Sequence, residues 1–352
     1  MQFWFGRQKQ AEAAPRHRQP APPPPMPAPP EEDPLEAVSA LLAGLKAIQN
    51  GAKGLAARGG WVFLINDTND FLSWHLGLKR WSDDEQAAVR NILDERIEQL
   101  SGRYYQMFIC PEKSIVYRDY LPAGLDAAAP CDDRPALAMA RMRPDAVHYL
   151  ADRFDALKRL GMLFFRGDTH VNWMGAYHLY RETILALQAR GAPVGPPLTF
   201  SHLQHFVAGM EGDVLIQLPE AAKDAFEVDA SLARVGNMLE LVISHTLPEA
   251  RKRARPVLTP EGFIPGGGGR ETVIMEQADK SLPKALIFRD STATLSIELL
   301  AQHFSRSVFV WQDGDVIGDL IDREQPDVIL HFVAERFLAT YPRSTAINHI
   351  HK

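Results

Sequence analysis

Residues 284–332 alternate short apolar segments with helix-like ones, and this alternation constrains the fold more than any other feature of the sequence. The connections are short, so consecutive elements are expected to lie side by side. Strands that alternate with helices are typical of a parallel sheet covered by helices. The expected elements, in the order strand, helix, strand, helix, strand, are Ala285–Phe288, Thr292–Phe304, Val308–Trp311, Val316–Arg323 and Val328–Phe332.

A similar alternation is expected in the first half of the chain. Ser82 with Glu85 fits a capping box, which predicts the start of a helix. The remaining predicted elements are strands at Trp61–Leu64, Tyr104–Cys110 and Met162–Phe165 and a helix at Ala146–Leu160. Together the two halves predict an α/β fold with a parallel sheet flanked by helices.

Changes in composition divide the chain into parts. Half of the residues from Pro15 to Pro34 are proline, which predicts an extended tail that is either a linker or a ligand for a proline-recognising partner. Farther along, Pro, Gly and strand-like runs at Leu198–Val207, Val214–Leu218 and Met238–His245 interrupt the alternation. The expected parts are a disordered proline-rich tail, a helical lead-in, a main domain with a partly β insertion and a C-terminal tail: 1–34, 35–57, 58–345 with 193–269 inserted, and 346–352.

Asp168 and His170 stand two residues apart in the turn that follows Met162–Phe165. A histidine that acts as a general base needs an acceptor on its second ring nitrogen, and a carboxylate on the same turn supplies one. Ser291 begins a predicted helix, where unpaired backbone N–H groups can stabilise an oxyanion. Because sites in open α/β sheets lie at the carboxyl ends of strands, these residues are expected to form a triad in one crevice.

Each of these residues also has an alternative role. Asp290 or Ser291 can simply cap the helix. Asp168 and His170 can also be half of a metal site. No HExxH pattern and no second compact cluster of ligands accompanies them, so no metal is expected.

Two further groups of polar residues, one of histidines and one of basic residues, favour no binding site. The spacing of His202, His205 and His245 fits no compact metal site, which favours satisfied or exposed histidines. The basic cluster Arg251–Arg255 is more typical of a solvated loop than of contact with a polyanion.

Five short segments, in order along about residues 58–340, carry a resemblance to a known family. They are Gly60-Trp61-Val62-Phe63-Leu64; Pro111 and Lys113 with Val116-Tyr117 and Leu121-Pro122; Asp168-Thr169-His170 with Asn172, Gly175 and Ala176; Asp290-Ser291; and Pro326-Asp327-Val328-Ile329 with Glu335-Arg336-Phe337. In this order the chain resembles the SGNH-hydrolase-like family of alginate O-acetyltransferases, the AlgX/AlgJ type. Gly212-Asp213 resembles a further pair of that family, of unknown role.

The resemblance implies that Ser291 is the nucleophile, His170 the base and Asp168 its orienting carboxylate. The implied activity is the transfer of an acyl group, most simply acetyl, to a polysaccharide hydroxyl through an acyl-enzyme. Two alternatives remain open: a carbohydrate esterase or deacetylase with the same triad, or a catalytically silent polysaccharide-binding or assembly module.

Substrate contacts are predicted from the residues beside the triad. They are Arg289, Asn172 and Trp173. Arg289 stands where the family often has a small residue, and a cation there would narrow the site or favour an anionic substrate. Val171 stands where the family usually has Trp, which would change how the sugar or the adjacent helix packs.

Several cofactors and partners are not expected because the sequence lacks the motifs that bind them. Without a GxGxxG motif or a P-loop, no nucleotide cofactor is expected, and the resemblance implies that a membrane acyltransferase partner supplies the acyl group. A net charge of −6 argues against a nucleic-acid partner. No apolar run reaches the ~20 residues of a transmembrane helix, and the first residues lack the apolar segment of a signal peptide. The sequence therefore predicts a cytoplasmic chain, whereas the resemblance implies the periplasm or cell envelope.

Overall fold

The computed structural model divides the chain into residues 1–33 and the compact unit Pro34–Lys352. It describes residues 33–219, 232–235, 237–264, 272–312, 314–341 and 346–349. Residues 1–32 of the predicted proline-rich tail and the last residues of the predicted C-terminal tail lie outside these described residues. The first described helix, α1 (Pro34–Gln49), begins at the last residue of the predicted tail, one residue before the predicted helical lead-in.

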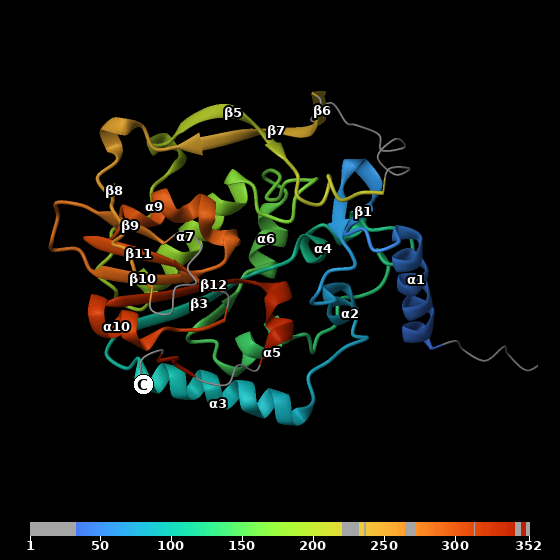
Figure 1. Ribbon diagram of the computed structural model, residues 1–352, viewed down its shortest axis with the longest axis horizontal. Helices are drawn as coiled ribbons and strands as arrows, with labels where there is room; N and C mark the ends of the chain where they lie inside the picture. The colour runs from blue at the N-terminus through green and yellow to red at the C-terminus, as the bar shows by residue number, and fades with distance from the viewer. Residues whose placement is uncertain are drawn as a thin grey trace, which may run out of the picture. The chain divides into compact units, whose positions relative to one another are not determined.

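A seven-stranded sheet forms the centre of the compact unit, in the order β4-β3-β12-β10-β11-β9-β8 (Figure 1). Its strands are β3 (Tyr104–Cys110), β4 (Val147–Tyr149), β8 (Arg255–Val257), β9 (Val273–Glu276), β10 (Lys284–Arg289), β11 (Arg306–Trp311) and β12 (Val328–Ala334). Strands β4, β3, β12, β10 and β11 are parallel to one another, while β9 and β8 add an antiparallel edge. The predicted parallel sheet flanked by helices is confirmed.

Helices cover both faces of this sheet, and successive residues of β10 contribute to two separate cores. Ile287 packs in the core that includes residues of α7 and α9, whereas Leu286 packs in the core that includes residues of α3, α5 and α10. This alternation follows from the period of two along a strand. The remaining helices are α2 (Phe71–His75), α3 (Asp83–Gln99), α4 (Lys113–Val116), α5 (Pro135–Met142), α6 (Ala151–Leu157), α7 (Trp173–Ala189), α9 (Ile297–Ala301) and α10 (Gly318–Glu324).

Short 3₁₀ helices connect several of these elements. They are η1 (Arg58–Gly60), η2 (Arg118–Tyr120), η3 (Phe200–His202), η4 (Glu249–Arg251), η5 (Ser291–Ser296) and η6 (Glu335–Thr340). Among the described residues, no helix has both the length and the apolar character needed to cross a membrane.

The strand predicted at Met162–Phe165 is wrong. This segment makes only an isolated bridge between Phe164 and Val171 and does not join the main sheet. Side chains satisfy its backbone instead: the Asn172 amide donates to Met162 O and Phe164 O, and Lys113 donates to Phe165 O. Buried carbonyl groups need a donor, but that donor need not be a neighbouring strand.

Other predicted elements differ in detail. Trp61–Leu64 supplies β2 (Val62–Leu64), which pairs only with β1 (Gly54–Ala56) in a separate antiparallel sheet. The helix predicted at Ala146–Leu160 is wrong in its first part, which forms strand β4, because the sequence Val-His-Tyr favours an extended backbone. Its second part forms helix α6. The helix predicted at Thr292–Phe304 is divided into η5 and α9, and the one predicted at Val316–Arg323 is α10.

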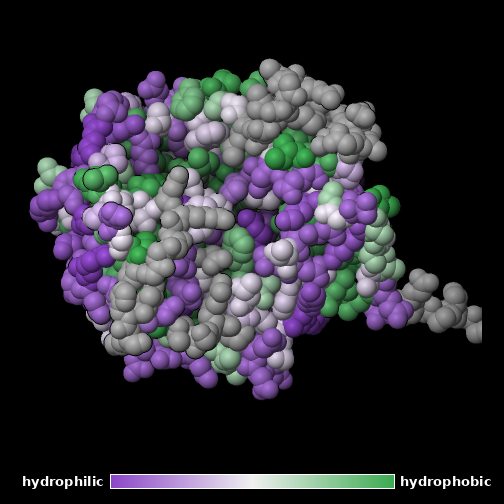
Figure 2. All heavy atoms as spheres, in the orientation of Figure 1, coloured by the Kyte–Doolittle hydropathy of each residue, from purple (hydrophilic) through white to green (hydrophobic). Residues whose placement is uncertain are grey.

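The region predicted as a partly β insertion contains a three-stranded antiparallel sheet, in the order β5-β7-β6. Its strands are β5 (Gln204–Glu211), β6 (Leu232–Val235) and β7 (Asn237–Thr246). The strand predicted at Val214–Leu218 is wrong, since this segment forms turns and packs against Val62. Val207 and Ile243 pair on this sheet and are 71 % and 72 % exposed. Figure 2 shows a group of hydrophobic atoms beside hydrophilic ones at the top of the molecule, where Figure 1 places β5 and β7. The range 193–269 also contains β8, which belongs to the main sheet.

We predict that Ser82→Ala lowers the free energy of unfolding by about 1 kcal/mol, because Ser82 caps α3. Its Oγ accepts from Glu85 N at 3.2 Å, and Glu85 Oε2 accepts from Ser82 N at 2.8 Å. Urea denaturation followed by circular dichroism measures the change. Ser101→Ala, in the exposed turn after α3, is the control, and an equal loss in both variants would contradict the capping role.

Candidate active site

The turn between Phe165 and His170 is held by a buried lysine from α4. Lys113 is 3 % exposed, and its Nζ donates to Phe165 O at 3.2 Å, Arg166 O at 2.8 Å and Asp168 O at 2.6 Å. Burial lowers the pKa of Lys113 to about 8, although nearby carboxylates, Asp168 foremost, oppose this. An ammonium group has three N–H donors, and three carbonyl groups of the turn accept them.

Asn172 ends the turn and begins α7. Its Oδ1 accepts from Met174 N and Gly175 N, both at 3.0 Å, so it is the N-cap of the helix. Its amide nitrogen donates to two carbonyl groups of the preceding segment. Asn172 was predicted to contact substrate. The residue is only 5 % exposed, however, and both its side-chain oxygen and its amide nitrogen already make these hydrogen bonds to the backbone.

Asp168 and His170 form a close pair within this turn. Asp168 Oδ1 accepts from the backbone N–H of His170 at 2.8 Å and lies 2.6 Å from its Nδ1. Asp168 is 2 % exposed, whereas the His170 side chain is 25 % exposed. An ionised carboxylate can only accept, so Nδ1 carries the proton and Nε2 keeps its lone pair.

The pKa values of the pair are shifted in opposite directions. Burial would lower the pKa of His170, but the hydrogen bond and negative charge of Asp168 raise it above its usual 6.5. Burial would raise the pKa of Asp168, yet its bonds to His170 and to the backbone lower it below its usual 3.8. Such a pair stabilises the imidazolium that a general base forms during proton transfer.

Asp213, which follows β5, is a second carboxylate at the turn. It accepts from Thr169 N at 2.7 Å and Thr169 Oγ1 at 2.6 Å, and its own N–H donates to Asp168 Oδ2 at 2.9 Å. Asp213 Oδ2 lies 3.8 Å from His170 Nδ1. It was not predicted as a site residue, although the Gly212-Asp213 pair was a usable signal. Gly212 is required there because a Cβ would stand 2.0 Å from Gly167 O.

The same three side chains offer atoms of the kind that bind metals. Ligand atoms of Asp168, His170 and Asp213 lie within 4.8 Å of one another. However, His170 Nδ1 already pairs with Asp168, and both oxygens of Asp213 accept from Thr169. This arrangement fits a hydrogen-bonded network better than a site whose donors await an ion.

Ser291 lies at the carboxyl end of β10, directly after Asp290. Asp290 caps η5 by accepting from Thr292 N at 2.8 Å, and its other oxygen accepts from Ala334 N at 2.6 Å. The cap predicted for Asp290 or Ser291 is therefore made by Asp290, which also joins the ends of β10 and β12. Ser291 is partly exposed.

The segments that carry Ser291 and His170 are neighbours. Ser291 begins η5, which packs against α7, where Ser296 Oγ donates to Ala176 O at 3.0 Å. His170 lies in the turn that precedes α7. The hydrogen bonds of the described residues do not include one between Ser291 and His170.

Arg336 belongs to a buried group of charges behind the site. It donates to Glu112 Oε1 at 2.7 Å, while Arg134 donates to Glu335 Oε1 at 2.9 Å. Tyr149 adds a 2.8 Å bond to Glu335. Burial raises the pKa of both glutamates, while their arginine partners lower it. These pairs join α4, α5 and β4 to the start of η6.

The other two predicted substrate contacts, Arg289 and Trp173, differ in exposure. Arg289 is 1 % exposed and directs its guanidinium to Asp290 O, Thr294 Oγ1 and the ring of Trp311. Trp173 is partly exposed and packs edge-on against Phe165, with the ring centroids 5.3 Å apart. Of the two, Trp173 is therefore the more accessible to a ligand.

We predict that Lys113→Met lowers the free energy of unfolding by about 3 kcal/mol, because three carbonyl groups lose their donor. Urea denaturation measures the loss. Lys158→Met is the matched control, since Lys158 also donates to a carbonyl group, Val116 O at 2.7 Å, but its side chain is 23 % exposed. If both variants lose the same stability, Lys113 has no special role in holding the turn.

Comparison with known proteins finds solved structures that share the fold of this chain. No protein-family model and no curated protein matches the sequence. Among solved structures, the O-acetyltransferase domain of Pseudomonas putida AlgJ matches with a TM-score of 0.52 at 17 % identity, over 83 % of this chain and 94 % of that one. Bacillus cereus PatB1 with a sulfonyl adduct matches with a TM-score of 0.54 at 13 % identity, over 81 % and 96 %.

A third structure, a DHHW family protein from Eubacterium siraeum, has a TM-score of 0.52 at 15 % identity, over 82 % of this chain and 95 % of that one. At these identities the likeness concerns the fold. It confirms, at the level of fold, the resemblance carried by the five sequence segments: this chain shares its fold with these structures, among them the AlgJ O-acetyltransferase domain.

Proposed function

We propose that this protein transfers an O-acyl group, most simply acetyl, to a polysaccharide hydroxyl through Ser291, His170 and Asp168. The observation that carries the proposal is the 2.6 Å contact between Asp168 Oδ1 and His170 Nδ1. It lies in the turn before α7, and α7 packs against the segment that begins at Ser291. The fold shared with the AlgJ O-acetyltransferase domain supports the same reading.

The first chemical step is the acylation of Ser291. His170 Nε2 takes the proton of Ser291 Oγ as the oxygen attacks the carbonyl carbon of the acyl donor. The backbone N–H of Ser291 would donate to the oxyanion, a contact of a kind worth about 3–4 kcal/mol in the transition state. The leaving group then takes the proton from His170, and an ester on Ser291 remains.

The second step reverses the direction of proton transfer. The acceptor hydroxyl gives its proton to His170 Nε2 and attacks the ester carbonyl, and Ser291 recovers a proton as it leaves. Asp168 stays ionised throughout, which agrees with its lowered pKa, and stabilises the imidazolium. No step uses a metal or a nucleotide. The acyl donor is proposed to come from a membrane acyltransferase partner.

The same residues would also serve a carbohydrate esterase, because water can replace the sugar hydroxyl in the second step. A silent polysaccharide-binding or assembly module is the alternative from another class. The retained Asp168–His170 pair favours an enzyme over that module. Transferase and esterase differ only in which acceptor reaches the acyl-enzyme.

We predict that an activated acetyl ester acetylates Ser291, and that a sulfonyl fluoride labels the same residue. Peptide mass spectrometry locates the modification, and release of the leaving group measures turnover. Ser291→Ala and His170→Ala should abolish both labelling and turnover, whereas Ser201→Ala, at an exposed serine, should retain them.

Adding an oligosaccharide acceptor distinguishes a transferase from an esterase. Added oligosaccharide should accelerate turnover and become acetylated if the protein is a transferase, while an esterase releases acetate alone. A folded protein that is never labelled at Ser291 and turns over no ester would refute the nucleophile assignment and favour the binding module.

We predict that acylation accelerates as the pH rises through the raised pKa of His170, because only the neutral imidazole accepts a proton. Asp168→Asn removes the group that raises this pKa. The rising part of the curve of acylation rate against pH should therefore shift to lower pH in this variant, and the rate on the plateau should fall by ~10²- to 10⁴-fold. Stopped-flow measurement of leaving-group release between pH 5 and 9 tests both effects.

Asp213→Asn provides a graded control. The charge of Asp213 raises the pKa of His170 less than the charge of Asp168 does. In Asp213→Asn the rising part of the pH–rate curve should therefore shift in the same direction by a smaller amount. A rising part that stays in place in Asp168→Asn would exclude His170 as the titrating base.

A further inference from the structure

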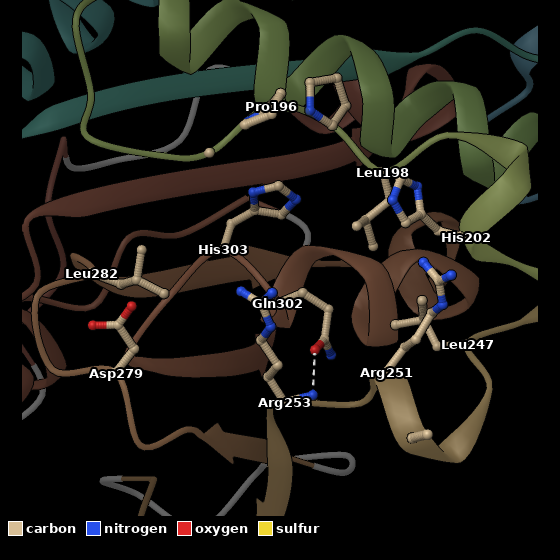
Figure 3. Close-up of a pocket in the computed structure, with 13 residues that line it drawn as sticks. Pro196, Leu198, His202, Leu247, Arg251, Arg253, Asp279, Leu282, Gln302 and His303 are labelled. Carbon is tan, nitrogen blue, oxygen red and sulfur yellow. Dashed lines mark hydrogen bonds between the residues drawn. The ribbon is translucent and has the colours of Figure 1, made fainter.

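A cavity of about 450 Å³ lies at the end of the main sheet opposite to Ser291 (Figure 3). Asp279 and Leu282 line it just before β10 begins, and Gln302 and His303 line it just after α9 ends. Ser291 follows the carboxyl end of β10. The six residues of that strand at about 3.3 Å each separate the two places by ~20 Å. The cavity is thus distinct from the candidate active site.

The basic cluster Arg251–Arg255 contributes cations to this cavity, and the structure divides the cluster into two pairs. Lys252 binds Glu298 at 2.8 Å, and Arg255 pairs with Glu249. Arg251 and Arg253, by contrast, are exposed and line the cavity, and the described residues give neither an ion-pair partner within 4.0 Å. Figure 3 shows both guanidinium groups directed into the space, toward His202 and His303.

The segment that carries these two arginines is anchored to α9. Gln302 is 9 % exposed, and its Oε1 accepts from Arg253 N at 2.8 Å and from Ala254 N at 3.2 Å. The Lys252–Glu298 pair ties the same segment to the helix from the other side. The backbone beneath the arginines is therefore held in place before any ligand arrives, which reduces the entropy lost on binding.

The charge balance of the lining is positive. Among the described residues that line the cavity, Asp279 is the one acidic residue, and Arg253 acts on it electrostatically. The Asp279 carboxylate already accepts from Ser281 N and Ser281 Oγ. His303 is neutral because burial lowers its pKa to about 4, and its Nε2 is bonded to Tyr180 Oη at 2.8 Å. Two guanidinium groups thus face one carboxylate.

The rest of the lining is apolar or weakly polar. Pro196, Leu198, Leu247 and Leu282 form the apolar part of the lining, and His202 lies beside Arg251. A bare ion would fill only a small part of this volume. A ligand with an anionic group and a small organic body would use both the arginines and the apolar walls.

We infer that this cavity binds a small organic oxyanion, a carboxylate or a phosphate ester, between Arg251 and Arg253. The inference is independent of the proposed function, because no residue of the triad lines the cavity. Guanidinium groups bind carboxylate and phosphate oxygens in the same forked geometry. The geometry therefore does not distinguish a carboxylate from a phosphate ester, and the experiment below does.

The test is isothermal titration calorimetry on the full chain at constant ionic strength, with glucuronate, glucose 6-phosphate and inorganic phosphate as probes and glucose as the neutral reference. Saturable binding of at least one oxyanion, with glucose at least tenfold weaker, is expected. Glucuronate as the tightest probe would assign a carboxylate, and glucose 6-phosphate a phosphate ester.

The variant Arg251→Gln/Arg253→Gln should weaken that binding at least tenfold. Arg80→Gln/Arg153→Gln removes the same number of exposed cations, each paired with a carboxylate outside the cavity lining, and should change it less than twofold. Ser291→Ala should bind as the unmodified chain does, so failure of the triad proposal leaves this result intact. No saturable binding, tightest binding of inorganic phosphate alone, or equal loss in the two double variants would overturn the inference.

Discussion

The ammonium group of Lys113 determines the backbone path on which the candidate active site depends. Three carbonyl oxygens of the turn at Phe165–Asp168 converge on it, and an arrangement of that kind needs a buried cation rather than a neighbouring strand. Burying a charge is costly unless its donors are all used. Here the cost is offset by those three contacts and by the rings of Trp61 and Phe63, 5.9 Å and 5.6 Å from Nζ.

The parts of the fold that could be predicted from sequence are those in which the backbone is satisfied locally or by adjacent strands. Strands β10, β11 and β12 were predicted because each is a short apolar run buried from both sides. Met162–Phe165 has the same composition, but its carbonyl groups are taken by Lys113 and Asn172. Composition does not distinguish these two ways of satisfying a backbone.

The candidate site was predictable to a similar extent. The pairing of Asp168 with His170 follows from a spacing of two residues in one turn, so it could be anticipated. The contact of Asp213 with Thr169 could not, because it joins segments 44 residues apart, and only the resemblance of Gly212-Asp213 to a pair of the family indicated this residue. The buried pairs made by Arg336 and Glu335 were likewise outside the reach of local patterns, although both residues stood in a recognised segment. Such pairs are specified by tertiary structure, and removing one partner leaves an uncompensated buried charge.

The turn also receives two carboxylates from the region of the three-stranded sheet. Asp213 follows β5 and holds Thr169, while Glu240 on β7 accepts from Arg166 N and Gly167 N. The basicity of His170 is therefore set jointly by two parts of the chain, only one of which carries Ser291. Sequence changes near the smaller sheet can therefore shift the pKa of His170 while the segment that begins at Ser291 stays unchanged, so the inserted region sets a property of a residue that lies outside it.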